Sequence, residues 1–157
     1  MSKQLIIYTD GAARGNPGPG GYGVVLQWGS VIKEVSQGYR HTTNNRMELM
    51  AVIAGLEMLT RDGLDVIIYS DSAYVVNAVE KGWLAGWVKK GFKDKKNPDL
   101  WQRYLTVAKK HRIKFVWVKG HADNKWNNRC DELATMAADS GKWLVDHGYE
   151  MAEKGLL

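Results

Sequence analysis

Ile6-Ile7-Tyr8-Thr9-Asp10-Gly11 is an apolar run that ends at an aspartate, and Ile67-Ile68-Tyr69-Ser70-Asp71-Ser72 has the same form. Short apolar runs of this kind are typical of buried strands. If the two strands are parallel neighbours in one sheet, their ends bring Asp10 and Asp71 together. Clustered carboxylates repel one another, so such a pair predicts a hard cation such as Mg²⁺.

Two further acids stand near the start of helix-like patterns. Glu48 follows Asn44-Asn45-Arg46-Met47, and Asp131 follows Asn128-Arg129-Cys130. Taken singly, each of these acids is more typical of a helix cap or a solvated strand end. As a set of four, the acids predict metal-dependent chemistry on a phosphate.

Composition favours a small globular protein with a polyanionic partner. The chain has 157 residues, 45% of them hydrophobic and 25% charged, and a net charge of +5. This length suits one domain, which we expect to span residues 1–157, with the tail after Gly141 packed on the body. Charge alone raises the case for nucleic acid only modestly, because many small basic proteins bind none.

The cysteine content, the length of the apolar runs and the N-terminal residues indicate the cellular compartment that we expect. Cys130 is the only cysteine, which excludes an intrachain disulfide and a cysteine-based zinc site, and we expect it to fill a small buried space. No apolar run is long enough to span a bilayer, and Met1-Ser2-Lys3-Gln4 leads into a strand without a signal peptide. We expect a soluble, cytoplasmic monomer with no membrane contact.

Periodicity predicts three early strands followed by alternating helices and strands. The expected strands are Leu5–Tyr8, Tyr22–Trp28, Val31–Tyr39, Val66–Tyr69 and Phe115–Val118, with a glycine-rich turn over Gly11–Gly21. Two of the expected helices have N-caps, one at Thr43 or Asn44 and one at Asp99, and the others begin at Ser72, Trp83 and Asn127. We expect Trp101 and Trp117 to lie in the core. The pattern indicates an α/β fold with a five-stranded mixed sheet, an antiparallel meander plus two parallel strands, flanked by helices.

Gly18-Pro19-Gly20-Gly21-Tyr22-Gly23 formally matches the dinucleotide-binding pattern G-x-G-x-x-G. That pattern should open a helix directly after a strand, whereas here it leads into the strand Val24-Val25-Leu26. We therefore reject a Rossmann fold.

Seven stretches together resemble bacterial type 1 ribonuclease H, in family order over nearly the whole chain. They are Tyr8-Thr9-Asp10-Gly11-Ala12, Gly15-Asn16-Pro17-Gly18, Thr43-Asn44-Asn45-Arg46-Met47-Glu48-Leu49, Ser70-Asp71-Ser72-Ala73-Tyr74-Val75, Asp99-Leu100-Trp101, Trp117-Val118-Lys119-Gly120-His121 and Asn128-Arg129-Cys130-Asp131-Glu132-Leu133-Ala134. Each motif alone is weak, but all of them in register are specific.

The resemblance implies a ribonuclease H-like fold and hydrolysis of the RNA strand of RNA–DNA hybrids, leaving 3′-hydroxyl and 5′-phosphate ends. Asp10, Glu48, Asp71 and Asp131 would hold two Mg²⁺ ions, with Mn²⁺ as an alternative. His121, in a loop where a lone histidine is usually just solvated, would transfer a proton or assist product release. A tether to replication proteins stays open.

The resemblance also implies a set of substrate contacts, although turn and cap chemistry explains the same residue types. Asn16, Asn44 and Asn45 would bridge the minor groove of the hybrid, and Thr43 and Asn97 would seat a DNA phosphate. Position 73, where many bacterial relatives carry a glutamine that contacts RNA, is alanine here. Asn77, one helical turn later, is a candidate replacement.

A basic segment interleaved with aromatic residues, Lys81 to Lys96, is the second functional element. A charge run alone is usually a solvated face, and Trp87 is expected to pack inward. The resemblance implies a protrusion that grips the DNA strand, with Trp83 near the deoxyribose path and lysines on phosphates. The lysines singled out for this role are Lys89, Lys90 and Lys93.

Two other functions compete with this one. A Holliday-junction resolvase or an integrase-like core would share the acidic cluster, but it would lack the context of Glu48 and the basic aromatic segment. A non-catalytic hybrid-binding module would usually have lost an acid, and all four are present.

Overall fold

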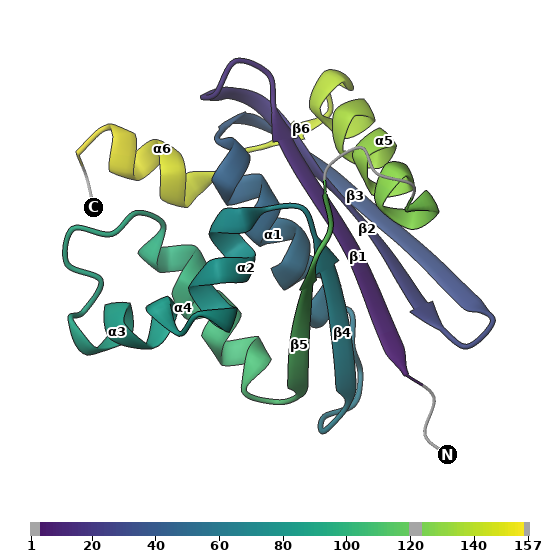
Figure 1. Ribbon diagram of the computed structural model, residues 1–157. Helices are drawn as coiled ribbons and strands as arrows, with labels where there is room; N and C mark the ends of the chain where they lie inside the picture. The colour runs from purple at the N-terminus through teal and green to yellow at the C-terminus, as the bar shows by residue number, and fades with distance from the viewer. Residues whose placement is uncertain (1–3, 120–123, 156–157) are drawn as a thin grey trace.

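One six-stranded mixed sheet, in the order β5-β4-β1-β2-β3-β6, organises the protein (Figure 1). The computed structural model describes residues 4–119 and 124–155. The strands are β1 (Leu5–Ala13), β2 (Gly18–Trp28), β3 (Val31–Thr42), β4 (Asp65–Ser70), β5 (Arg112–Trp117) and β6 (Trp143–Leu144). The helices are α1 (Asn44–Glu57), α2 (Ala73–Glu80), α3 (Trp83–Lys89), α4 (Pro98–Ala108), α5 (Lys125–Asp139) and α6 (His147–Glu153).

The strand pairing confirms the mixed sheet. β1, β2 and β3 form an antiparallel meander, while β4 and β5 extend the sheet from β1 in parallel. The expected number of strands, five, was wrong. The tail adds β6, whose Trp143 and Leu144 pair in parallel with Gly38 and Tyr39 of β3. A strand of two residues is too short for periodicity to reveal.

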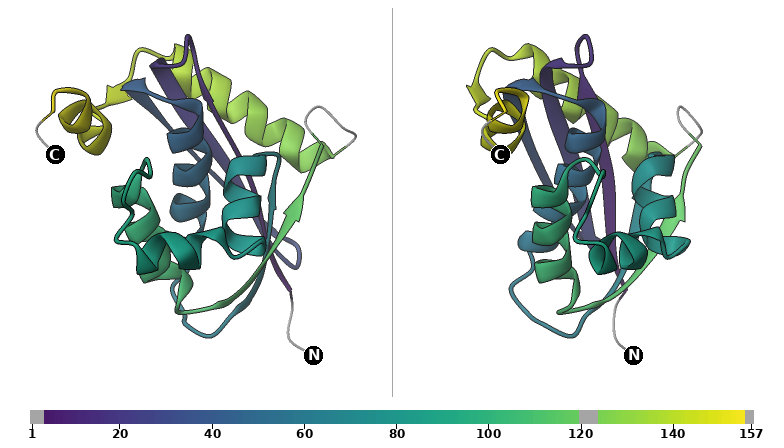
Figure 2. Two further views of the ribbon diagram at one scale, coloured as in Figure 1. Left: turned by 60° about the vertical axis from the view of Figure 1, so that its left-hand side comes forward. Right: turned by 90° about the vertical axis from the view of Figure 1, so that its left-hand side faces the viewer.

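Side chains along β1 alternate between the two faces of the sheet, so β1 contributes residues to two hydrophobic cores, one on each face. Leu5 and Ile7 belong to the larger core, which they share with α1, α2 and α4. Tyr8 points to the other face, where it joins Val25 of β2 and Cys130 and Leu133 of α5. Figure 2 shows α5 alone on one side of the sheet and the other large helices across from it.

Glycines in β2 let α5 lie directly on the sheet. A Cβ at Gly21 or Gly23 would collide with the α5 backbone at Ala134 or Cys130. The expected glycine-rich turn over Gly11–Gly21 was therefore too long, because β1 continues to Ala13 and β2 begins at Gly18. These glycines mark close helix packing inside a strand as well as a turn.

Trp101 is fully buried, as expected, but Trp117 is 54% exposed, so its expected place in the core was wrong. Trp117 stands at the last position of β5, two residues beyond the buried Phe115 on the same face of the sheet. The expected cap of α4 at Asp99 was also wrong. The helix begins at Pro98, after Asn97 in a left-handed conformation, and Arg46 holds the Asp99 carboxylate.

The tail packs on the body, as expected, and a buried ion pair that the sequence did not predict holds it there. Arg46 is 3% exposed and Asp146 8%, and the Arg46 Nε donates to Asp146 Oδ2 at 2.7 Å. The Thr42 hydroxyl donates to the same carboxylate oxygen at 2.7 Å. None of the helices in residues 4–119 and 124–155 has the length and apolar character needed to cross a bilayer.

Candidate active site

Strand register brings the two aspartates level with each other. Tyr8 of β1 pairs with Tyr69 of β4 in parallel, and each aspartate follows two residues later. Asp10 still belongs to β1, while Asp71 lies between the end of β4 and Ser72, the N-cap of α2. The expectation that parallel neighbouring strands bring these residues together is confirmed.

Glu48 reaches the aspartates because α1 starts directly on β1. Thr43 caps the helix by accepting the Arg46 N–H, one of the two caps expected, and Gly11 leaves no side chain between β1 and the backbone at Glu48. The Gly11 N–H donates to Asp10 Oδ1 at 2.9 Å and also to Glu48 Oε1.

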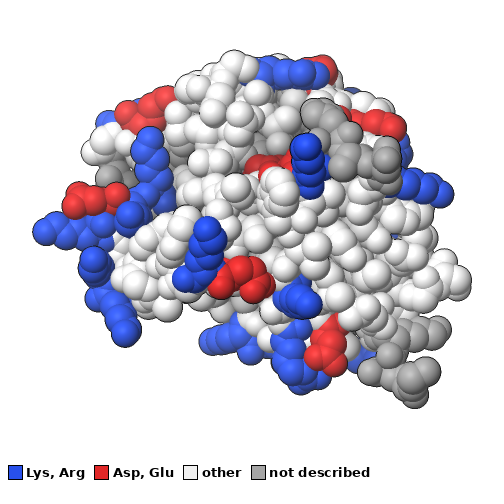
Figure 3. All heavy atoms as spheres, in the orientation of Figure 1, with Lys and Arg blue, Asp and Glu red and all other residues white. Residues whose placement is uncertain are grey.

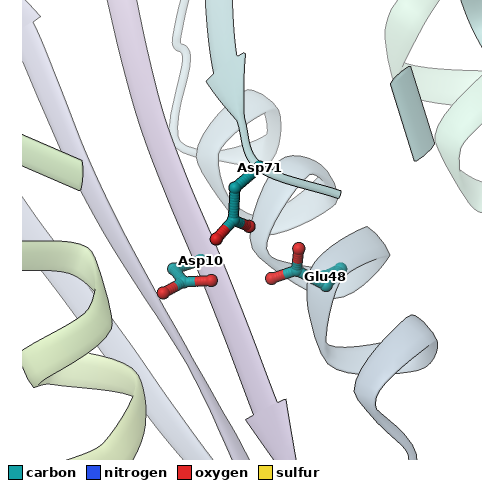
Figure 4. Close-up of side chains that lie close together, drawn as sticks. All are labelled: Asp10, Glu48 and Asp71. Carbon is teal, nitrogen blue, oxygen red and sulfur yellow. The ribbon is translucent and has the colours of Figure 1, made fainter. Parts of the chain in front are cut away.

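The three carboxylates converge on one point. Asp10, Glu48 and Asp71 each offer an oxygen, and these oxygens all lie within 4.8 Å of one another. Figure 4 shows the three side chains pointing toward one another from β1, from α1 and from the end of β4. Oxygens of this type and spacing are the ligands that hard divalent cations prefer.

Burial and mutual repulsion make the cluster reluctant to ionise. Burial first, and then the charges of Asp71 and Asp131, raise the pKa of the Asp10 carboxyl to about 7. Burial and the charges of Asp10 and Asp71 hold the pKa of Glu48 well above its usual range. A cation between these groups would remove this repulsion, so the cluster fits a metal ion.

A pocket of about 400 Å³ surrounds the acids. Asp131 of α5 lines it as well, although it stands outside the group of three convergent carboxylates. Sequence reasoning missed several of its lining residues, among them Ser72, Lys119, Asn127 and Asn128. Asn127 precedes Asp131 by four residues on α5, a helical spacing that indicates a shared face.

The predicted asparagine contacts meet at the N-terminus of α1. The Asn44 Oδ1 accepts the Ala13 N–H at 2.6 Å, and the Asn44 N–H donates to Asn16 Oδ1 at 3.0 Å. Each residue thus has turn or cap chemistry as well as its proposed substrate role. Asn44 and Asn45 line the acidic pocket. Asn45 also lines a second pocket, of about 620 Å³, together with Asn16 and Thr43.

Asn97 and Asn77 have different surroundings. Asn97 lines the second pocket, accepts a hydrogen bond from Arg46 Nη1 at 3.2 Å and donates one to the Tyr74 hydroxyl at 3.2 Å. Asn77 lies in α2 and lines neither of these two pockets, whereas Ala73 lines the acidic one. The structure thus does not bring Asn77 to the place that Ala73 occupies.

The basic segment forms α3 and the loop that follows it. Lys89 ends α3, Lys90 caps it, and Lys93 lies in the loop. Trp83 is exposed at the start of the helix, with the Lys81 ammonium 5.5 Å from its ring centroid, and Trp87 packs inward beside Trp101. Figure 3 shows Lys and Arg side chains gathered at the left of the molecule, where this segment lies. His121 falls outside the described residues.

Comparison with known proteins decides the family. The RNase H family model matches residues 2–139, which include the strands, helices and acids that build the pocket. The chain belongs to the ribonuclease H family. The fold expected from the sequence resemblance is therefore confirmed.

Ribonuclease H relatives match the chain over most of its length. A ribonuclease H from Syntrophus aciditrophicus is 55% identical over 94% of this chain and 87% of its own length. A ribonuclease HI from Synechocystis sp. is 50% identical over 92% of this chain and 94% of its own. Among solved structures, LC9-RNase H1 shares 31% identity at a TM-score of 0.80, covering 97% of this chain and 81% of that one.

A substitution at Gly11 tests how this ribonuclease H fold positions Glu48. In Gly11→Ala the new methyl group would collide with the backbone of Met47 and Glu48, so α1 must move away from β1. We expect a loss of stability of about 1–3 kcal/mol together with a loss of nuclease activity. Thermal unfolding and a hybrid-cleavage assay measure the two effects.

Gly86→Ala is the matched control, because Gly86 lies within α3 with no atom near the position of the added methyl group. It should stabilise the helix slightly or leave it unchanged. Equal effects of the two substitutions would contradict the role given to Gly11.

Proposed function

We propose that this protein is an endonuclease that hydrolyses the RNA strand of RNA–DNA hybrids and leaves 3′-hydroxyl and 5′-phosphate ends. The convergence of Asp10, Glu48 and Asp71 in a pocket whose rim carries Asn44 and Asn45 is the observation that carries this proposal. The ribonuclease H family supports the substrate class. A relative, LC11-RNase H1, 30% identical over 87% of this chain at a TM-score of 0.60, was solved in complex with an RNA/DNA hybrid.

The acidic pocket suits two divalent cations. Its candidate ligands are all carboxylates, the donor type that Mg²⁺ and Mn²⁺ accept, and Asp10, Glu48, Asp71 and Asp131 would hold the ions. When bound, such ions supply charge neutralisation at the scissile phosphate and favour deprotonation of the attacking water. The resemblance favours Mg²⁺.

The protein's own groups prepare this site. The Gly11 N–H fixes the orientation of both Asp10 and Glu48 through its two hydrogen bonds. Because the register of β1 and β4 sets the separation of the aspartates, the ligands need little rearrangement when a cation binds. His121 would transfer a proton or assist product release.

Recognition of a hybrid requires the enzyme to distinguish RNA from DNA on each strand, and the 2′-hydroxyl is the label available. Asn45 lines both pockets. Its side-chain amide can therefore contact one strand of the hybrid while the other strand lies against Thr43 and Asn97. Asn16 and Asn44 hold the same turn in place. Asn77, one helical turn after Ala73 on α2, would contact the RNA strand outside the acidic pocket, which it does not line.

Analysis of the product ends tests the proposed chemistry. An RNA strand labelled at its 5′ end and annealed to DNA should be cut internally with Mg²⁺, and the labelled fragments should carry 3′-hydroxyls. With the label at the 3′ end instead, the labelled fragments should carry 5′-phosphates. Addition of EDTA should stop cleavage but preserve much of the hybrid binding, measured in parallel by fluorescence anisotropy. Binding without cleavage under any metal condition would instead indicate a non-catalytic hybrid-binding module.

The basic segment should contribute affinity without sequence preference. Changing Lys89, Lys90 and Lys93 together to alanine should weaken hybrid binding and flatten its salt dependence. The slope of log K against log salt should fall by about 0.9 for each phosphate that a lysine no longer neutralises. Fluorescence anisotropy across a salt series measures this slope.

The matched control changes Lys109, Lys110 and Lys114 to alanine, which removes the same charge. These residues are exposed and line neither the acidic pocket nor the second one. If the slope changed equally in both triple variants, or in neither, the basic segment would not be part of the surface that binds the hybrid.

A further inference from the structure

The C-terminal helix α6 is held firmly against the end of β3. Asp146 caps the helix by accepting the Tyr149 N–H, and its carboxylate also accepts two hydrogen bonds from Arg46. The Arg40 guanidinium adds a two-point contact with the Glu150 carboxylate, at 2.9 and 2.8 Å. His41 Nε2 lies 3.1 Å from Glu153 Oε2. The helix therefore has a fixed position relative to α1.

One face of α6 forms a wall of the second pocket. Gly148, Tyr149, Ala152 and Glu153 line it from the helix, opposite residues that include Asn16 and Thr43. A Cβ at Gly148 would collide with the Asp99 carboxylate, so this glycine lets the helix lie directly on the ion pair of Arg46 and Asp99. Through Asn45, which lines both pockets, this wall is continuous with the acidic site.

Two lysines of the basic segment bring positive charge to this pocket. Lys95 and Lys96 line it and form no ion pair within the described residues. Arg46 carries one positive charge and pairs with two carboxylates, those of Asp99 and Asp146, so it has no positive charge left for a ligand. On the α6 side, Glu153 is the acid nearest the pocket, and His41 is its partner. The lysines thus provide positive charge available to a phosphate.

The Tyr149 ring gives this wall a rigid surface. Its centroid lies 5.5 Å from that of His41, and its hydroxyl donates to Glu153 Oε2 at 3.1 Å. An aromatic ring held at both ends contributes contact area to a bound strand at little entropic cost. The neighbouring Ala152 is small and exposed, so the surface beside the ring is open.

We propose that α6 is part of the substrate-binding surface: the DNA backbone of the hybrid, seated at Thr43 and Asn97, continues along the wall formed by Tyr149 and Ala152. This inference rests on the proposed function, because it takes the second pocket to receive the DNA strand. Helix α6 would then be a second element, besides the basic segment, that contacts the DNA strand. No acidic or basic sequence motif marks this part of the chain.

Charge placed on neighbouring residues of α6 tests the proposal. Ala152→Glu puts a negative charge on the pocket wall and should weaken hybrid binding about fivefold at moderate salt, whereas Ala152→Lys should strengthen it by a similar factor. Met151 is 38% exposed and lines neither pocket. Met151→Glu and Met151→Lys should change binding less than about twofold under the same conditions.

Binding is measured in EDTA, so that no strand is cut, at about 0.15 M salt and again at about 0.5 M, where the effects at position 152 should shrink. A variant that misfolds would weaken binding with either charge, whereas the proposal requires opposite signs. Equal responses at positions 151 and 152, or the same sign for both charges at 152, would overturn it. A wild-type protein that does not bind the hybrid would refute the proposed function instead.

Discussion

Asp10→Asn should reduce hybrid cleavage by roughly three orders of magnitude or more, the scale on which losing a central charge-stabilising group is measured. Asn keeps the shape of the side chain but removes one negative charge from the convergent carboxylates, so affinity for a divalent cation falls. Hybrid binding should persist, because the basic segment is unchanged. Single-turnover cleavage and anisotropy measure the two effects separately.

Stability distinguishes this prediction from simple misfolding. Burial and repulsion raise the pKa of the Asp10 carboxyl to about 7, so its charge is unfavourable in the folded protein without a cation. Asp10→Asn should therefore melt at the same temperature as the wild type or higher. Glu132→Gln, which removes an exposed charge paired with Arg129, should leave cleavage unchanged. Full activity in Asp10→Asn would refute its assignment as a metal ligand.

Arg46→Met should destabilise the protein by about 3–5 kcal/mol, because it leaves a buried carboxylate without its partner. Burial opposes the charge of Arg46, yet its hydrogen bonds with Asp99 and Asp146 hold its pKa above the usual value. For a chain of this length, the loss corresponds to a melting temperature lower by roughly 10 °C. Thermal unfolding followed by circular dichroism measures the shift.

Arg112→Met provides the matched comparison, because Arg112 forms an exposed ion pair with Asp65. Exposed pairs contribute little, so this variant should lose less than about 1 kcal/mol. Adding Asp146→Asn to Arg46→Met should recover part of the loss, because the uncompensated charge is removed. Similar losses in the two arginine variants would contradict the central role of the buried pair.

The clustered aspartates could be predicted because their signals are local. An apolar run followed by aspartate marks both Asp10 and Asp71. Because their strands pair in parallel, the two aspartates lie side by side. The approach of Glu48 depends on the absence of a side chain at Gly11, which a sequence shows only as one more glycine. Sequence reasoning therefore found the acids of the site but neither all of its lining residues nor the contact that assembles it.

The contact that holds the tail, and the packing role of the glycines in β2, escaped prediction for a different reason. Asp146 binds Arg46, which lies 100 residues earlier in the sequence. The periodicity of a short tail cannot predict a contact between residues so far apart. Gly21 was expected in a turn and Gly23 in a strand, and neither expectation showed that both make room for the backbone of α5. Trp117 continues the face of Phe115, but packing ends before it. In each case tertiary packing overrides the local signal.

Cleavage of one sequence prepared as RNA–DNA hybrid, duplex RNA, duplex DNA and single-stranded RNA tests the central claim most directly. Each strand is labelled in turn, and each substrate is incubated with Mg²⁺ and with EDTA. The proposed function predicts Mg²⁺-dependent cutting of the hybrid's RNA strand alone. Intact hybrid in Mg²⁺, or equal cutting of duplex DNA, would contradict it.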